Sequence, residues 1–137
     1  MKELEGIEQE VSTWPNISVR ANRFGGRAFF FGNAEVGHIH TGGAIDIPFP
    51  RSFRDELLAQ GLAEEHRWVP DSGWVTFRVR SEEDMEQALG LLRLSYLRYA
   101  LRKDSNPGKL LEREAEEILV TPRLKALLER VVPVGAI

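Results

Sequence analysis

The sequence predicts a single α+β domain built around a mostly antiparallel sheet of about five strands. Its 137 residues are enough for one hydrophobic core. Short apolar or alternating runs, separated by turn-forming residues, predict neighbouring antiparallel strands. One long amphipathic segment is suited to cover such a sheet. We expect the domain to span residues 1–103, and residues 104–137 to form a helical C-terminal extension that packs on it.

The order of the elements follows from apolar periodicity and turn signals. An N-terminal helix should end at Trp14-Pro15, because a proline disfavours helix in the residue before it. Strands are expected over 17–21, 28–31, 35–41, 44–49, 63–69 and 74–80, with turns at Gly32-Asn33, at Gly42-Gly43 and in the PDSG stretch 70–73. Further helices are expected over 50–61, 81–103, 109–119 and 121–132.

The long helix over 81–103 has a clear start and two apolar stripes. Ser81 and Asp84 form a capping-box pattern that marks its first turn. Two stripes are more than packing on one sheet requires. We expect the C-terminal extension to cover the second stripe, and the alternative is a subunit interface in a homodimer. This second stripe consists of Leu91, Leu94, Leu97 and Leu101.

Composition and charge limit the classes of function. The net charge of -3 argues against an obligate nucleic-acid-binding protein, which usually relies on a basic surface. No apolar run approaches the roughly 20 residues of a spanning helix, and the chain starts with an acidic amphipathic segment, so we expect a cytoplasmic protein with no membrane partner. The absence of cysteine excludes disulfides and thiolate metal sites. The small number of asparagines and glutamines and the excess of arginine over lysine both fit a thermophilic source. A GC-rich genome would explain the arginine excess equally well.

The stretch GHIHTGGAID, residues 37–46, gathers the residues with the most chemistry. His38 and His40 are two positions apart, so both side chains point to the same face of a strand. Asp46 follows on the next strand, and His66 would join them if the second hairpin lies alongside. Their nitrogen and oxygen atoms suit zinc, iron or nickel. Polar strand residues that only face solvent are common, so we expect no metal or other cofactor; if a metal binds, His38, His40 and Asp46 are its candidate ligands.

Three functions fit these residues. We expect a cytoplasmic binding or interaction module whose polar groove takes a small anionic ligand or a protein partner, because arginine forks beside an aromatic ring suit anions. The rival is an enzyme, either metal-assisted or with the three histidines as candidate acids or bases beside Asp46. The third is nucleic-acid binding through the face of Arg78 and Arg80, against which the acidic balance argues. The candidate ligand-binding residues are Arg51, Arg54, Trp74 and Arg78.

A series of motifs spans residues 14 to about 99: Gly37-His38-x-His40, Asp46-x-Pro48, Arg54, His66, Pro70, Ser72-Gly73-Trp74 and Ser95-Tyr96. This series resembles the luciferase-domain family, a set of small bacterial and fungal proteins named after a sponge member. The family name implies no luciferin site in this sequence. A weaker resemblance, to the MmcQ/YjbR-like proteins, rests on His66, Trp74 and Ser95-Tyr96. It implies an α+β fold with an antiparallel sheet and a double-wing surface for DNA.

Overall fold

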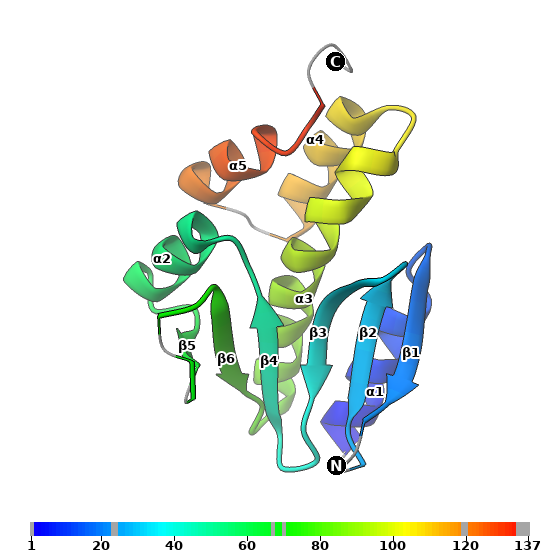
Figure 1. The fold of residues 1–137 in the computed structure, drawn as a ribbon, viewed down its shortest axis with the longest axis vertical. Helices are drawn as coiled ribbons and strands as arrows, with labels where there is room; N and C mark the ends of the chain where they lie inside the picture. The colour runs from blue at the N-terminus through cyan, green and yellow to red at the C-terminus, as the bar shows by residue number, and fades with distance from the viewer. Residues whose placement is uncertain (1, 23–24, 67, 70, 119–120, 134–137) are drawn as a thin grey trace.

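The computed structural model describes residues 2–22, 25–66, 68–69, 71–118 and 121–133. Over these residues the chain forms one six-stranded antiparallel sheet and five helices, which confirms the predicted α+β class (Figure 1). The strand order is β1-β2-β3-β4-β6-β5. The first four strands therefore form a meander, and the second hairpin joins it through β6.

The bounds of the elements lie close to those predicted for most of the chain. The strands are β1 (Ile17–Ala21), β2 (Arg27–Phe31), β3 (Ala34–Ile39), β4 (Ala44–Pro48), β5 (Glu64–Glu65) and β6 (Trp74–Arg78). The helices are α1 (Lys2–Ser12), α2 (Arg51–Ala59), α3 (Glu82–Lys103), α4 (Pro107–Glu117) and α5 (Pro122–Glu129). None of the described helices is both long and apolar enough to cross a membrane.

The strand predicted over 63–69 is the main difference between expectation and structure. The observed strand β5 holds only two residues, which pair with β6. His66 would continue this strand, but it leaves the ladder, and its ring nitrogen lies 3.3 Å from the carboxylate of Asp46. A polar contact with the centre of the sheet thus replaces strand pairing at this point. Positions 67 and 70 of the predicted hairpin lie outside the described residues.

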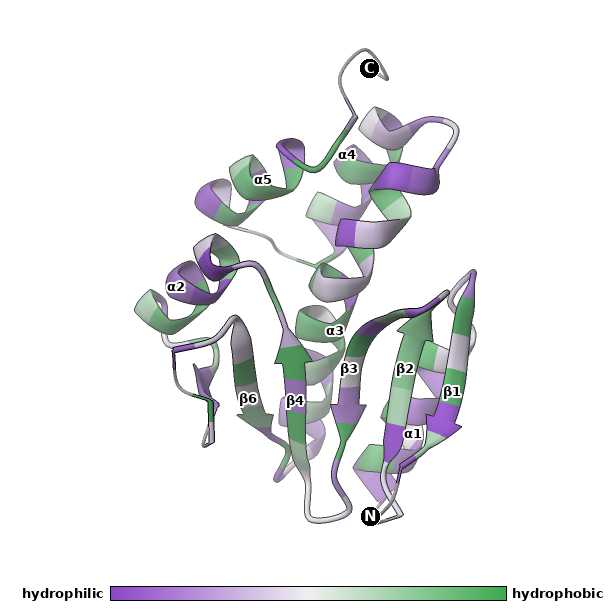
Figure 2. Cartoon of the chain, viewed as in Figure 1, coloured by the Kyte–Doolittle hydropathy of each residue, from purple (hydrophilic) through white to green (hydrophobic). Residues whose placement is uncertain are grey.

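Helices α1 and α3 pack on the same face of the sheet, behind it in Figure 1. Helix α1 contacts β1 and β2, whereas α3 contacts β3 and β4. Along each strand, alternate residues point into this helix-covered layer and form the core. Figure 2 shows hydrophilic and hydrophobic residues alternating along α2, α4 and α5, as expected for helices with one buried face. The fully buried core residues include Ile7, Phe29, Ile45, Ile47, Val75 and Leu92.

The start of α3 has one of the two contacts of the predicted capping box and a variant of the other. The Ser81 hydroxyl accepts a hydrogen bond from the backbone N–H of Asp84 (3.3 Å). The carboxylate of Asp84 accepts one in return from the backbone N–H of Arg80 (2.8 Å). The first bond satisfies an N–H group that the helix leaves without a partner, whereas the second ties down Arg80, which precedes the N-cap Ser81. The acidic first turn complements the helix dipole.

The second stripe of α3 is covered within the chain. Its four leucines are at most 4% exposed. Helix α4 packs on α3, and α5 packs on α2. The buried Glu114 of α4 pairs with Arg93 of α3, with Nε and Oε2 3.1 Å apart, and the Arg93 guanidinium also lies over the ring of Trp14. This stripe therefore needs no partner subunit to cover it.

Gly73 lies where two backbone segments approach too closely for a side chain. The N–H of Phe49 donates to the carbonyl of Gly73 (3.1 Å), and a Cβ at Gly73 would lie 1.8 Å from the carbonyl oxygen of Phe49. We expect Gly73→Ala to lower the free energy of unfolding by at least ~2 kcal/mol, because the two segments must separate. Chemical denaturation followed by circular dichroism measures this loss. Gly42→Ala is the matched control, since its Cβ would meet nothing within 4 Å; equal losses in both variants would contradict the explanation.

Candidate functional site

Cross-strand register brings the candidate residues together on the sheet face opposite α3. His38 of β3 pairs with Asp46 of β4, which pairs with Thr76 of β6. Neighbouring residues in this row point to the same face. His40, two residues beyond His38, points to that face as well. Three strands therefore supply side chains to one small area of the open face.

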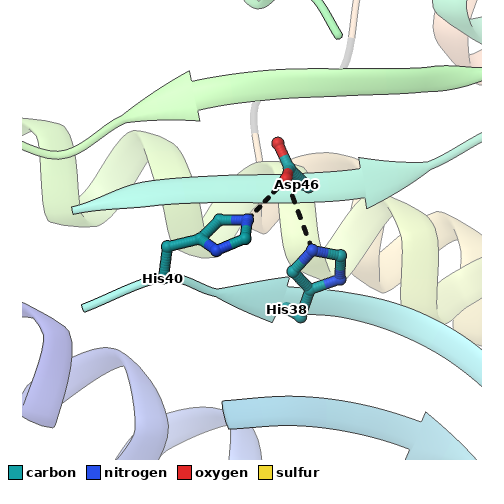
Figure 3. A group of neighbouring side chains, drawn as sticks. All are labelled: His38, His40 and Asp46. Atoms are coloured by element: carbon teal, nitrogen blue, oxygen red, sulfur yellow. Dashed lines mark hydrogen bonds and ion pairs between the residues drawn. The ribbon is translucent and has the colours of Figure 1, made fainter. Parts of the chain in front are cut away.

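The Asp46 carboxylate is the centre of this area, and it is only 4% exposed. Its Oδ2 atom lies 2.7 Å from Nε2 of His40 and 3.3 Å from Nε2 of His38 (Figure 3). Nε2 of His66 also lies 3.3 Å from Oδ2. The Thr76 hydroxyl donates a hydrogen bond to the other oxygen, Oδ1 (2.7 Å). All three histidines of the chain thus meet one buried carboxylate.

Two of the histidines also have a contact on their second ring nitrogen. Nδ1 of His38 lies 2.6 Å from the carboxylate of Glu35, so this nitrogen carries a proton that it donates. Nδ1 of His66 instead accepts a hydrogen bond from the backbone N–H of Trp68 (3.2 Å). In neutral His66 the proton therefore lies on Nε2, which faces Asp46. The two rings are fixed in different proton arrangements.

A β-bulge in β3 puts Glu35 on the same face as His38. The register between β2 and β3 shifts there: Phe29 pairs with Gly37, but Phe30 pairs with Glu35. In a regular strand, residues three apart point to opposite faces. The extra residue of the bulge reverses the alternation, so Glu35 reaches His38. Without the bulge, the His38 ring would lose Glu35 and keep Asp46 as its carboxylate partner.

Helix α3 holds the two strands of the site from behind. The buried hydroxyl of Ser95 donates to the carbonyl oxygen of Val36, the bulge residue (2.7 Å). Arg98 donates to the carbonyl oxygen of Pro48 at the end of β4 (2.6 Å). A Cβ at Gly37 would lie 2.7 Å from a methyl group of Leu92, so α3 packs directly against the β3 backbone there. Ser95 thus has a structural contact here, and it lies on the helix side of the sheet.

The charges of the site reinforce one another. Burial raises the pKa of Asp46, but the hydrogen bonds from His38, Thr76 and His40 outweigh it, so this pKa lies well below its usual range. Hydrogen bonds to Asp46 and to Glu35 raise the pKa of His38 to about 9, although burial opposes them. At neutral pH, His38 is therefore an imidazolium held between two carboxylates.

The predicted ligand-binding residues are only partly brought to this cluster. Trp74 belongs to it, because its ring centre lies 5.4 Å from that of His38 and 6.1 Å from that of His66. The arginines have contacts of their own elsewhere. Arg51 donates to the carbonyl of Asp71; Arg54 pairs with Asp55 and with Glu65; and Arg78 lies 3.9 Å from Glu64.

Three residues of the site were not singled out from the sequence. Thr76 could have been found, because the alternation of β6 puts it on the same face as Trp74. Glu35 could not, since the spacing of a regular strand puts it opposite to His38. Arg98 is an arginine within an apolar stretch of a long helix, and tertiary contacts such as its hydrogen bond to Pro48 accompany its burial.

The fold and the cluster define an α+β protein with a carboxylate-centred histidine site on the open face of its sheet. Residues 33–95 match the family model described as Luciferase domain. This match supports the luciferase-domain family, and the matched segment contains the whole histidine cluster together with Ser95. No curated protein and no solved structure matches the chain significantly. The weaker resemblance to MmcQ/YjbR-like proteins gains no support from these comparisons.

The raised pKa of His38 should make the stability of the protein depend on pH. The proton on His38 has a pKa of about 9 in the folded state, against 6.5 for an ordinary histidine. The resulting stabilisation is full below pH 6.5 and is lost as the pH rises through about 9, because the folded state binds this proton more tightly than the unfolded state. We expect the melting temperature without metal to fall by roughly 3–6 °C across this window.

Thermal denaturation in the presence of a chelator, repeated across this pH range, measures the effect. The His38→Gln variant should lack the alkaline loss, because the titrating ring is gone. A profile for this variant that runs parallel to the wild-type profile would assign the loss to other groups.

Asp46 acts in the opposite direction: its lowered pKa stabilises the fold above the ordinary carboxyl pKa, and acid removes that contribution.

Proposed function

We propose that this luciferase domain binds one divalent transition-metal ion of the zinc type and uses it for metal-assisted hydrolytic chemistry on the open face of the sheet. The observation that carries the proposal is the convergence of His38, His40 and Asp46, whose ligand atoms all lie within 4.8 Å of one another. From the sequence alone this was the weaker alternative, because solvent-facing histidines are common. The convergence of these side chains on a buried carboxylate favours a metal site over histidines that only face solvent.

The distances suit a tetrahedral ion. Two ligand atoms that are each 2.0–2.1 Å from such an ion lie roughly 3.3 Å apart. Nε2 of His38 and Oδ2 of Asp46 have that separation, 3.3 Å. Nε2 of His40 lies at hydrogen-bond distance from the same oxygen, 2.7 Å, and would move away by about 0.6 Å as the ion replaces the shared proton. Binding therefore releases protons, and affinity should rise with pH.

The surrounding contacts are those that metal ligands usually have. A histidine ligand commonly donates its second N–H to a carboxylate, as His38 does to Glu35. The second oxygen of a carboxylate ligand commonly accepts a hydrogen bond, and here Oδ1 of Asp46 accepts one from the Thr76 hydroxyl. These contacts orient the ring and the carboxylate before any ion arrives. They support a site whose geometry is largely formed in advance.

The number of ligands favours a catalytic role over a structural one. Structural zinc sites are closed by four protein ligands, whereas catalytic sites keep a position open for water. We count three here and leave out His66, because its Nδ1 accepts a hydrogen bond from Trp68 and its proton is then on Nε2. The His40 side chain is 39% exposed, so water can reach the site. An ion held by His38, His40 and Asp46 would supply the activation of water for hydrolysis of a carbonyl or phosphoryl substrate.

The other functions predicted from the sequence gain less from the described contacts. An anion site lined by arginines would need their charges to be available, but Arg54 and Arg78 pair with acidic residues. Arg80 lies at the start of α3, where its backbone N–H contacts Asp84. Binding of an anionic ligand or a nucleic acid, a homodimeric state, a cytoplasmic location and a thermophilic source stay predictions.

Metal binding is tested on purified protein that has been treated with a chelator. Titration calorimetry with Zn²⁺ should give one site per chain, and elemental analysis of the protein before treatment should find bound metal. Asp46→Asn keeps the shape of the side chain but removes the charge, so we expect it to weaken binding by at least about 100-fold. His38→Ala and His40→Ala should do the same. Wild-type protein that takes up no metal, or an Asp46→Asn variant with unchanged affinity, would overturn the proposal.

Two further variants test the details of the ligand set. Glu35→Gln should weaken binding by about tenfold, because the carboxylate that orients His38 is lost. His66→Gln removes a histidine that contacts Asp46 but lies outside the proposed ligand set, so it should weaken binding about as much as Glu35→Gln does and much less than His40→Ala does. A loss in His66→Gln as large as that in His40→Ala would mean a closed site with four ligands and would contradict the catalytic role.

A further inference from the structure

A groove of about 1090 Å³ lies on the other side of the sheet, beside α3. Helix α3 forms one wall, the end of α2 and the following turn form another, and residues of α4 and α5 close one end. Phe77 of β6 lines it and pairs with the core residue Ile45, so the groove is on the helix-covered face and the histidine cluster is on the opposite face. The two sites are therefore separate.

The groove combines apolar surface with acidic edges. Its apolar lining includes Leu62, Phe77, Leu89 and Ile118, which are only partly buried although they pack against the core. Six of its lining residues are acidic, whereas Arg93 is its one basic residue among those described. Arg93 is already paired with Glu114. The acidic residues that are exposed and form no ion pair with another described residue are Glu10, Glu83, Glu86 and Glu117.

Gly90 leaves the backbone of α3 without a side chain where the helix lines the groove. It lies in the middle of a 22-residue helix, where glycine is less favourable than alanine. A Cβ at Gly90 would meet nothing within 4 Å, so no packing within the described chain requires glycine there. The consequence is that the helix backbone is open to the groove at this point. A partner that packs closely against α3 would use that space.

We propose that this groove binds a basic amphipathic segment of a partner protein, with the apolar side of the segment on Phe77 and Leu89. Charge complementarity favours this occupant. The apolar residues of the segment would pack on the apolar lining of the groove, and its lysine or arginine side chains would reach the unpaired carboxylates along the edges. An acidic segment would meet like charges. A second copy of this chain, with its net charge of -3, is a poorer match than a basic segment.

The test uses the full chain and a fluorescein-labelled helical peptide built of leucine and lysine, with fluorescence anisotropy as the readout. We expect saturable binding that weakens as salt is added, and much weaker binding of the same peptide with glutamate in place of lysine. Gly90→Leu fills the groove and should weaken binding by at least about tenfold. Gly90→Ala is the matched control: it also removes the helix glycine, but it adds only one methyl group, so the loss should stay below about threefold.

A second pair of variants separates the groove charges from net charge. Glu86→Lys with Glu117→Lys reverses two edge carboxylates and should weaken binding of the basic peptide by about tenfold. Glu5→Lys with Glu112→Lys makes the same change in net charge on exposed positions that do not line the groove. Equal losses in the two pairs, or wild-type affinity in Gly90→Leu, would overturn the proposal. Binding of free spermine without binding of the peptide would also overturn it, because the groove would then hold a small polycation instead of a protein segment.

Discussion

The buried carboxylate of Asp46 is the constraint on which the rest of the candidate site depends. A charge with so little exposure to water is costly unless hydrogen bonds and opposite charge surround it. The protein meets this need with three histidines and one threonine, drawn from three separate parts of the chain. One consequence is visible in the strands themselves, because His66 leaves β5 to reach Asp46.

The bulge in β3 completes the charge balance. His38 as an imidazolium between two carboxylates needs Glu35 on the same face, and the shift in register supplies it. A bulge is tolerated only where its free backbone groups find partners, and Ser95 of α3 satisfies the carbonyl of Val36. The contact between α3 and β3 thus acts on the far side of the sheet, where the ring of His38 lies. Packing and site geometry are parts of one arrangement.

Helix α3 has two roles that its sequence combines. Along one side it fixes β3 and β4 through Ser95 and Arg98. Along another it lines the acidic groove, with Gly90 exposed to that space. The proposed metal site and the proposed docking groove would therefore share one rigid element. A partner segment packed on α3 would contact the same helix that fixes the two strands of the proposed metal site.

The sequence by itself determined the class of fold, the order of the elements and the caps of α3, because these depend on local periodicity and turn residues. It also placed His38 and His40 on one face, since strand alternation has a period of two. Only the tertiary structure decided that His66 meets Asp46 and that Glu35 reaches His38. The first depends on pairing between distant strands and the second on a one-residue bulge, and neither leaves a periodic signal. The groove beside α3 likewise depends on the packing of helices that are far apart in sequence, which no local pattern reveals.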